Sequence, residues 1–189
     1  MDWGDVVAVV ALLVALMALP TAIQMFWGRA TLRISFEARP STRKEDVIIL
    51  WCQLLNPPVT NRLLRVLHVE REEIKDALAH YQLRDEANDK LEFQANPYLA
   101  PLYDVTAESQ RTRIPPSDSP YVFRVVTINV TRHEVFTIPR DGEQRLIRPG
   151  LYKVMVEVKV DGSKTYKGAT KLLVQDHDPY AYFVDTEHK

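Results

Sequence analysis

Length, composition and charge limit the classes of protein to which this chain can belong. It has 189 residues, of which 24 are basic and 25 acidic, giving a formal net charge of −1. From Ala30 onward the two signs balance at 23 each, so no nucleic acid is expected as a partner, because such a surface needs a basic excess on one face. Cys52 is the only cysteine, which excludes an intramolecular disulfide and leaves no second thiol for a CxxC metal site.

The N-terminal segment, residues 1–28, is predicted to be a transmembrane helix. Every residue over 6–19 is apolar. The mainly apolar character continues to Trp27, and at about 1.5 Å per residue this length spans about 30 Å of hydrocarbon. Trp3 at one end and Phe26 and Trp27 at the other lie where aromatic side chains prefer the two membrane interfaces.

The charges at the two ends of this segment predict its processing and orientation. Asp2 and Asp5 precede it and no basic residue does, whereas a cleaved signal peptide begins with a cationic stretch. We therefore expect a retained anchor. The basic residues that follow it are Arg29, Arg33, Arg39, Arg43 and Lys44. By the positive-inside rule this excess places the N-terminus outside and the C-terminal domain in the cytoplasm, in a bacterial inner (plasma) membrane.

Small residues share one face of the predicted helix. They are spaced 4, 3, 4, 3 and 4 residues apart and are Gly4, Ala8, Ala11, Ala15, Ala18 and Ala22. At about 100° per residue they cover an arc of roughly 80°. Small side chains let membrane helices approach closely, so a packing face is favoured over an accidental cluster of alanines.

The expected partners follow from this face. They are the lipid bilayer and further copies of the chain, with a different membrane subunit as the alternative to self-association. Gln24 lies on another face of the helix, near enough to the interface to reach water.

Residues 29–189 are predicted to form one soluble domain built mainly from β-strands. Apolar and polar residues alternate over 32–37, which is typical of a half-buried strand, whereas the nearly continuous apolar run over 47–55 is typical of a central strand. Asp161-Gly162 is typical of a hairpin turn. Further strands are expected at residues 63–70, 121–130, 133–138, 151–160 and 166–174.

Two stretches of this domain are interpreted differently. In residues 71–85 the apolar residues fit either the spacing of one helix face or the alternation of a strand. A short amphipathic helix is preferred. The residues at helical spacing are Ile74, Ala77, Leu78 and Tyr81. Residues 86–120 carry many turn-forming residues and are predicted to be long surface loops with at most a short strand. Together these elements predict a mainly β fold, a sandwich or small barrel with one short helix.

The segment before the strand at 151–160 resembles a tyrosine corner. It contains Leu146 and then Arg148-Pro149-Gly150-Leu151-Tyr152, and resembles the start of the penultimate strand in immunoglobulin-like sandwiches. The resemblance implies an immunoglobulin-like β-sandwich in which the hydroxyl of Tyr152 bonds back to the preceding connection. The chain departs from the antibody-type pattern because it lacks the cysteine pair. Its start is similar to small uncharacterised bacterial membrane proteins in which one helix leads into a β-domain.

The sequence predicts no catalytic, cofactor-binding or metal site, and the protein is not expected to be an enzyme. Residues 161–165 end in Lys-Thr, like a phosphate loop, but lack its earlier glycine and lie in a hairpin. Some potential ligands near the C-terminus match no zinc or calcium spacing and are interpreted as a solvated tail. These are His177, Asp178, Asp185, Glu187 and His188.

Three functions are weighed on this basis. The first is a non-enzymatic interaction or assembly module, in which an oligomerising anchor displays the β-domain. The alternative is a ligand-sensing membrane effector of a bacterial signalling or defence system, which would bind a small polar or nucleotide ligand in the long loops. Its candidate residues are Tyr98, Tyr103, Arg111 and Arg113. A membrane-bound hydrolase using the terminal His and Asp residues comes last.

Overall fold

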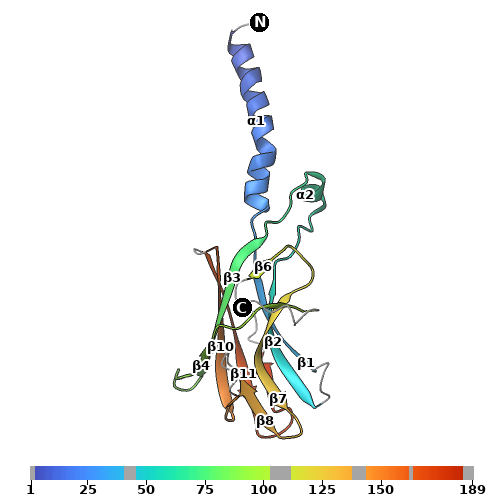
Figure 1. The fold of residues 1–189 in the computed structure, drawn as a ribbon. Helices are drawn as coiled ribbons and strands as arrows, with labels where there is room; N and C mark the ends of the chain where they lie inside the picture. Colours follow the sequence, from blue (N-terminus) through green and yellow to red (C-terminus); the bar gives the residue numbers. More distant parts are fainter. Residues whose placement is uncertain (1–2, 41–45, 103–111, 138–143, 162–163, 185–189) are drawn as a thin grey trace.

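One long helix stands on a domain of two antiparallel β-sheets (Figure 1). The structure is a computed structural model that describes all residues except 1–2, 41–45, 103–111, 138–143, 162–163 and 185–189. The helix is α1 (Trp3–Trp27). We call the strands and loops from Ala30 to Val184 the β-domain, and the end from which α1 emerges its membrane end. The fold is therefore mainly β with one N-terminal apolar helix, as predicted.

The first sheet has the strand order β1-β2-β7-β8-β9, with β5 also paired to β7. Alternation in β1 sends Ile34 and Phe36 toward the core and leaves Arg33 exposed on the outer surface, which is why this sequence forms a half-buried strand. The elements are β1 (Arg33–Pro40), β2 (Val47–Leu55), β5 (Ala100–Pro101), β7 (Tyr121–Asn129), β8 (Glu134–Thr137) and β9 (Arg145–Leu146).

The second sheet has the order β12-β11-β10-β3-β4, with β6 also paired to β3. Strands β10 and β11 form the predicted hairpin, in which Val160 pairs with Lys164 and Asp161 adopts a left-handed conformation with φ 50°. The elements are β3 (Ile74–Asp85), β4 (Leu91–Ala95), β6 (Thr112–Ile114), β10 (Gly150–Val160), β11 (Lys164–Val174) and β12 (Ala181–Val184).

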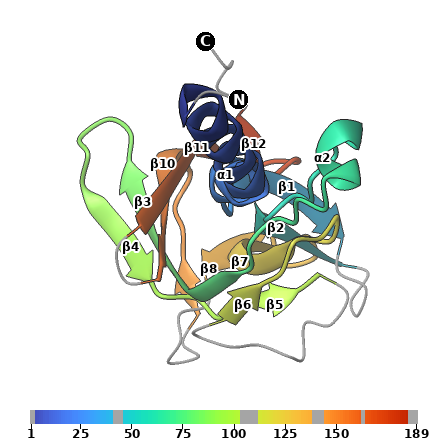
Figure 2. The same ribbon diagram turned by 90° about the horizontal axis from the view of Figure 1, so that it is seen from above.

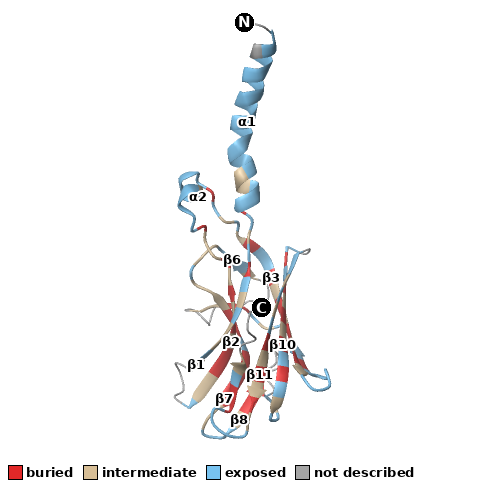
Figure 3. Ribbon diagram, turned by 180° about the vertical axis from the view of Figure 1, so that it is seen from behind, coloured by how far each residue is buried: buried red, intermediate tan, exposed pale blue. Residues whose placement is uncertain are grey.

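Inward side chains of both sheets form one hydrophobic core. Tyr81 of β3 packs on Phe123 of β7 with ring centroids 5.6 Å apart, so the two sheets share this interior. Seen along α1, the strands of the two sheets lie on either side of it (Figure 2). Burial colours place the buried residues in the strands and leave α1 exposed (Figure 3). Burial of these apolar side chains, together with their close packing, is the main stabilising contribution to the β-domain.

The sheets also meet at one pair of edges. Phe36 of β1 contacts Phe183 of β12 with ring centroids 5.2 Å apart. Gly168 of β11 lies so close to β1 that a Cβ there would stand 2.7 Å from Ile34 Cγ2. A glycine is required at this point because any larger side chain would force the strands apart.

The predicted bond of Tyr152 is present. Its hydroxyl donates a hydrogen bond of 2.7 Å to the carbonyl oxygen of Arg148, ahead of β10. Burial, and then the carboxylates of Glu92 and Asp85, raise the pKa of Tyr152, which keeps its hydroxyl protonated and able to donate. The wider immunoglobulin-like resemblance stays a prediction.

Two predicted elements near the membrane end are wrong. Residues 63–70 form no strand; α2 (Arg62–Val66) and a turn occupy this stretch, because Asn61 caps a helix there by accepting a hydrogen bond from Leu63 N. The stretch 71–85 contains the strand β3, Ile74–Asp85, rather than a helix. In β3 a bulge between Ile74 and Ala77 shifts the register, and this bulge produces the three-residue spacing that suggested a helix.

Later in the chain the sequence also underestimated the strands. Residues 86–120 contain β4, β5 and β6, where at most one short strand was expected. The C-terminal stretch interpreted as a solvated tail contains β12, which pairs with β11. Short strands at sheet margins carry too few residues to show a period of two.

We predict that Tyr152→Phe destabilises the protein by about 1 kcal/mol, because the Arg148 carbonyl loses its partner. Thermal unfolding of the full chain in detergent should show a midpoint lower by about 2–4 °C. Tyr182→Phe is the matched control, since the Tyr182 hydroxyl makes no hydrogen bond to the described residues and the side chain is 36% exposed. Equal midpoints for both variants would contradict a stabilising role for the Tyr152 bond.

Candidate functional site

The anchor is the first feature with functional meaning. One helix, Val6–Trp27, is long and apolar enough to cross a membrane, and the ribbon of α1 stands clear of the β-domain and is coloured mostly as exposed (Figure 3). Its small-residue face is open, and a Cβ added at Gly4 would meet nothing within 4 Å. The role of the six small residues as a packing face stays a prediction.

Aromatic side chains mark the two ends of this helix. Trp3 is 85% exposed at one end, and Phe26 and Trp27 are 70% and 52% exposed at the other. The rings of Phe26 and Trp27 contact each other with centroids 5.6 Å apart. Their positions fit the predicted interface anchors, because amphipathic rings favour the headgroup level.

The last turns of α1 are hydrogen-bonded to a segment far along the chain. Gln24 Nε2 donates to the carbonyl oxygen of Glu70 at 2.8 Å, and Glu70 N donates to Gln24 Oε1 at 3.2 Å. One amide side chain thus satisfies both backbone groups of Glu70. Gln24, which was expected to reach water, connects α1 to the β-domain.

Three further bonds complete this contact. Glu72 N donates to Gly28 O at 2.7 Å, and Arg71 Nη1 donates to Arg29 O at 2.8 Å. Arg29 Nε in turn donates to the carbonyl of Met25 at 2.9 Å, which satisfies a carbonyl left free at the helix end. We call residues 24–29 together with residues 70–72 the anchor junction.

Asn56 extends the anchor junction into both sheets. It is 1% exposed at the end of β2, and its Nδ2 donates to Glu72 O at 2.9 Å and to Ile114 O of β6 at 3.1 Å. A buried amide with two backbone partners holds these segments in one geometry. The signal available in the sequence was a polar side chain directly after an apolar strand.

Gly28 has no room for a side chain at the anchor junction. A Cβ there would lie 2.3 Å from Gln24 Nε2 and 2.6 Å from Gln24 O. Gly28 itself is buried, and its amide donates to Gln24 O at 2.8 Å. Any larger residue would displace the Gln24 side chain that holds Glu70.

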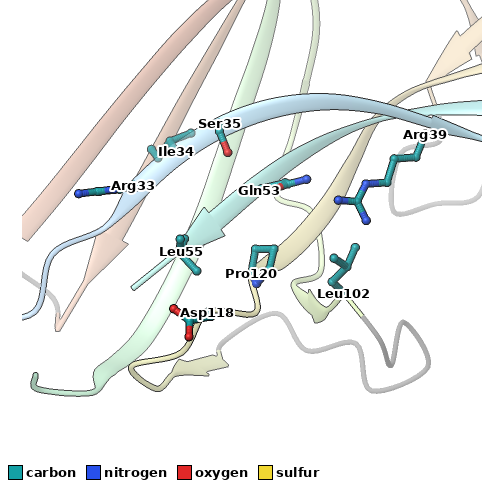
Figure 4. A pocket seen from close by; sticks show the side chains of 9 residues that line it. All are labelled: Arg33, Ile34, Ser35, Arg39, Gln53, Leu55, Leu102, Asp118 and Pro120. Carbon is teal, nitrogen blue, oxygen red and sulfur yellow. The ribbon is translucent and has the colours of Figure 1, made fainter. Parts of the chain in front are cut away.

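A groove opens on the outer surface of β1 and β2 (Figure 4). Its volume is about 720 Å³, within the range of small-molecule sites. The polar lining residues are Arg33, Ser35, Arg39, Gln53 and Asp118, and Leu55, Leu102 and Pro120 add apolar surface. Arg33 begins β1 shortly after the anchor junction, so the groove and the anchor share one short segment of chain.

An ion pair lies beside the groove. Arg39 Nε and Nη2 donate to the two carboxylate oxygens of Glu37 at 2.8 and 2.9 Å, and Gln53 Nε2 donates to the same carboxylate. The bonds from Arg39, together with its charge, hold the pKa of Glu37 below its usual value. Glu37 is therefore ionised near neutral pH and offsets the charge of Arg39.

The structure describes two of the four residues predicted for a ligand loop, so that loop stays a prediction. Tyr98 precedes β5 of the first sheet, whereas Arg113 is exposed on β6 of the second. Tyr103 and Arg111 lie outside the described residues. The groove on β1 and β2 was missed, because its lining also includes Leu102, Asp118 and Pro120, which lie far from these two strands in the sequence.

The described residues offer little for catalysis. Burial raises the pKa of the Cys52 thiol, which suppresses the reactive thiolate. His177 is exposed beside Asp176, with Nδ1 3.1 Å from the carboxylate, while Asp185, Glu187 and His188 lie outside the described residues. Within the described ranges, no group of three His, Cys, Asp or Glu side chains is placed to hold a metal ion.

Comparison with protein-family models, curated proteins and solved structures returns no match. The case for function therefore depends on the geometry of the anchor, the anchor junction and the groove. Of these, the anchor junction has the most developed contacts, because backbone and side-chain bonds from three separate parts of the chain meet there.

We predict that Gly28→Ala opens the anchor junction while leaving the strands folded. The new Cβ would displace the Gln24 side chain, so the amides of Glu70 and Glu72 should exchange with deuterium about tenfold faster. Hydrogen exchange of the full chain in detergent micelles measures this. Gly4→Ala is the control in the same helix, since it meets nothing within 4 Å. Unchanged exchange in Gly28→Ala would show that the glycine is dispensable.

Proposed function

We propose that this protein is a membrane-anchored, non-enzymatic interaction module that assembles with further copies through α1 and presents its β-domain at the membrane surface. The observation that carries the proposal is the anchor junction. Four hydrogen bonds join residues 70–72 to the last turns of α1 and the two residues after it. A domain held in this way is presented in a defined orientation, which a flexible tether does not provide.

The open small-residue face of α1 supports assembly. In a bilayer, apolar side chains gain nothing from leaving lipid, so helices associate through close backbone approach. The face carries its small residues at alternating spacings of three and four, which suits a left-handed helix pair. Self-association would then arrange several β-domains side by side at one membrane surface.

The proposed orientation places the β-domain in the cytoplasm. Arg33 and Arg39 belong to β1 rather than to a juxtamembrane loop, and Arg43 and Lys44 lie outside the described residues. Arg29 lies in the anchor junction, and Arg62 and Arg65 are exposed on the neighbouring α2. These three basic residues stand close to the end of α1, so the positive-inside rule favours the same sidedness.

The groove favours a second candidate, a ligand-sensing membrane effector. Its lining offers Arg33 for an anion together with hydroxyl, amide and carboxylate groups, a mixture suited to a small polar ligand or a nucleotide. A ligand held there would contact β1, which leads directly back to the anchor junction. Its signal would pass into the arrangement of the α1 helices.

We predict that Ala11→Leu combined with Ala15→Leu lowers the oligomer mass in detergent, because larger side chains on the small-residue face keep two helices apart. Light scattering coupled to size-exclusion chromatography measures the mass. Leu13→Phe combined with Leu16→Phe enlarges the opposite face and should leave the mass unchanged. An unchanged mass in the alanine variant, or an equal loss in the control, would reject assembly through this face.

The second candidate predicts stabilisation by a ligand. At about a hundredfold above its dissociation constant, a nucleotide that binds the groove should raise the unfolding midpoint by about 5–10 °C. Arg33→Gln should reduce that rise, whereas Arg132→Gln, an exposed arginine in the turn between β7 and β8, should not. A panel of nucleotides that stabilises neither the native chain nor the control would leave the interaction module as the better account.

A further inference from the structure

A second apolar surface lies at the membrane end of the protein. Helix α2 contains no buried residue. Leu63, Val66 and Leu67 are 75%, 72% and 53% exposed. Their spacing of three and four residues places them on one face of the helical turn. Large aliphatic side chains gathered on an exposed face mark a surface that has a partner.

The position of this face is fixed by the anchor junction. Arg65 Nε donates to Val59 O at 3.0 Å, and Val69 N donates to Leu64 O at 2.9 Å. These bonds hold α2 to the segments directly before and after it. Val69 is buried, and the next residue is Glu70, whose backbone Gln24 holds. The short stretch from α2 to Glu70 therefore cannot move far from the last turns of α1.

Both views place α2 beside the end of the anchor. In Figure 1 it lies level with the last turn of α1, and in Figure 2, along the axis of α1, it lies to one side. The last turn carries Phe26 and Trp27, the aromatic residues of the membrane interface. When α1 crosses a bilayer, the apolar face of α2 is thus held at the headgroup level.

We propose that α2 is a second membrane contact, whose Leu63, Val66 and Leu67 enter the surface of the bilayer that α1 crosses. The charges around this face fit a lipid surface. Arg62 and Arg65 are exposed next to it, and residues 61–69 include no acidic residue. In interfacial helices, arginine pairs with lipid phosphate, and the neighbouring aliphatic side chains insert at the boundary between headgroups and acyl chains.

This second contact would restrict how the β-domain tilts. A single helix leaves a domain free to rotate about the helix axis and to rock against the membrane. A contact to one side of α1 removes the rocking, and it directs one edge of the β-domain toward the lipid.

The test places an environment-sensitive fluorophore at Leu63→Cys and at Val66→Cys in the full chain. The chain is reconstituted in vesicles of phosphatidylcholine and phosphatidylglycerol, with or without lipids that carry a nitroxide at the headgroup. The native Cys52 is fully buried, so the wild type serves as the unlabelled control. Leu146→Cys is the water-exposed control, because Leu146 is 67% exposed on β9, which pairs with β8 at the end away from α1 (Figure 1).

Labels at residues 63 and 66 are expected to emit at shorter wavelength than the label at residue 146. The headgroup nitroxide should quench them several-fold more strongly. Equal emission and quenching at all three positions would overturn the proposal. A shifted emission without quenching by nitroxide lipid would also overturn it, since the face would then be covered by protein, such as a second copy.

A label at Leu13→Cys, in the middle of α1, separates this inference from the anchor itself. Nitroxide placed deep in the acyl chains should quench that label in the same vesicles. Quenching at residue 13 without quenching at residues 63 and 66 would reject the contact of α2 and leave the anchor standing. Loss of quenching at residue 13 would reject both.

Discussion

The hydrogen bonds between the last turns of α1 and the backbone of residues 70–72 are the constraint on which the rest of the molecule depends. A helix end leaves carbonyl groups without partners, and an edge segment leaves amides without partners. At the anchor junction the amide of Glu72 bonds to a carbonyl at the helix end. The side chains of Gln24 and Arg71 each bond to the backbone of the opposite segment. The apolar helix α1 is therefore joined directly to the β-domain, and the orientation of the strands follows from that of the helix.

Asn56 makes this constraint apply to both sheets. Its buried amide joins the end of β2, in the first sheet, to Glu72 and to β6 of the second. A polar group buried at such a point costs free energy unless it is hydrogen-bonded, so its partners are held in place. The close approach of Gly168 to Ile34 fixes the two sheets again at a neighbouring edge. The β-domain can thus move with respect to α1 only as a whole, or by breaking these contacts.

Much of the fold could be predicted because short segments of the sequence carry the signals for it. A continuous apolar run marked the apolar helix, and alternation marked β1. The pair Asp161-Gly162 marked the hairpin of β10 and β11. The strand β3 was misread because its bulge places Ile74 and Ala77 three residues apart on one face, as a helix would. Helix α2 was misread because its apolar residues suggested burial, whereas they remain exposed.

Sites that join distant segments could not be predicted from the sequence. The aromatic residues at the ends of α1 lie on one segment, so their role as interface anchors can be proposed from the sequence alone, and it stays a prediction. The anchor junction joins residues 46 positions apart, and the groove joins β1, β2 and the segment before β7, so neither leaves a periodic pattern in the sequence. Long-range pairing of this kind is decided by the packing of the whole sheet.

The two candidate functions place the same demand on the anchor junction. A partner bound to the β-domain, or a ligand in the groove beside Arg33, can influence α1 only if strand β1 and the helix end move together. The bonds of Gln24, Gly28 and Arg29 supply that coupling. The connection from Arg29 to Arg33 is short, so a movement of β1 would also move the end of α1. Coupling also runs the other way, since packing of α1 against another helix biases the β-domain by the same free energy. In both candidate functions, assembly through α1 and recognition by the β-domain would therefore be coupled through the anchor junction.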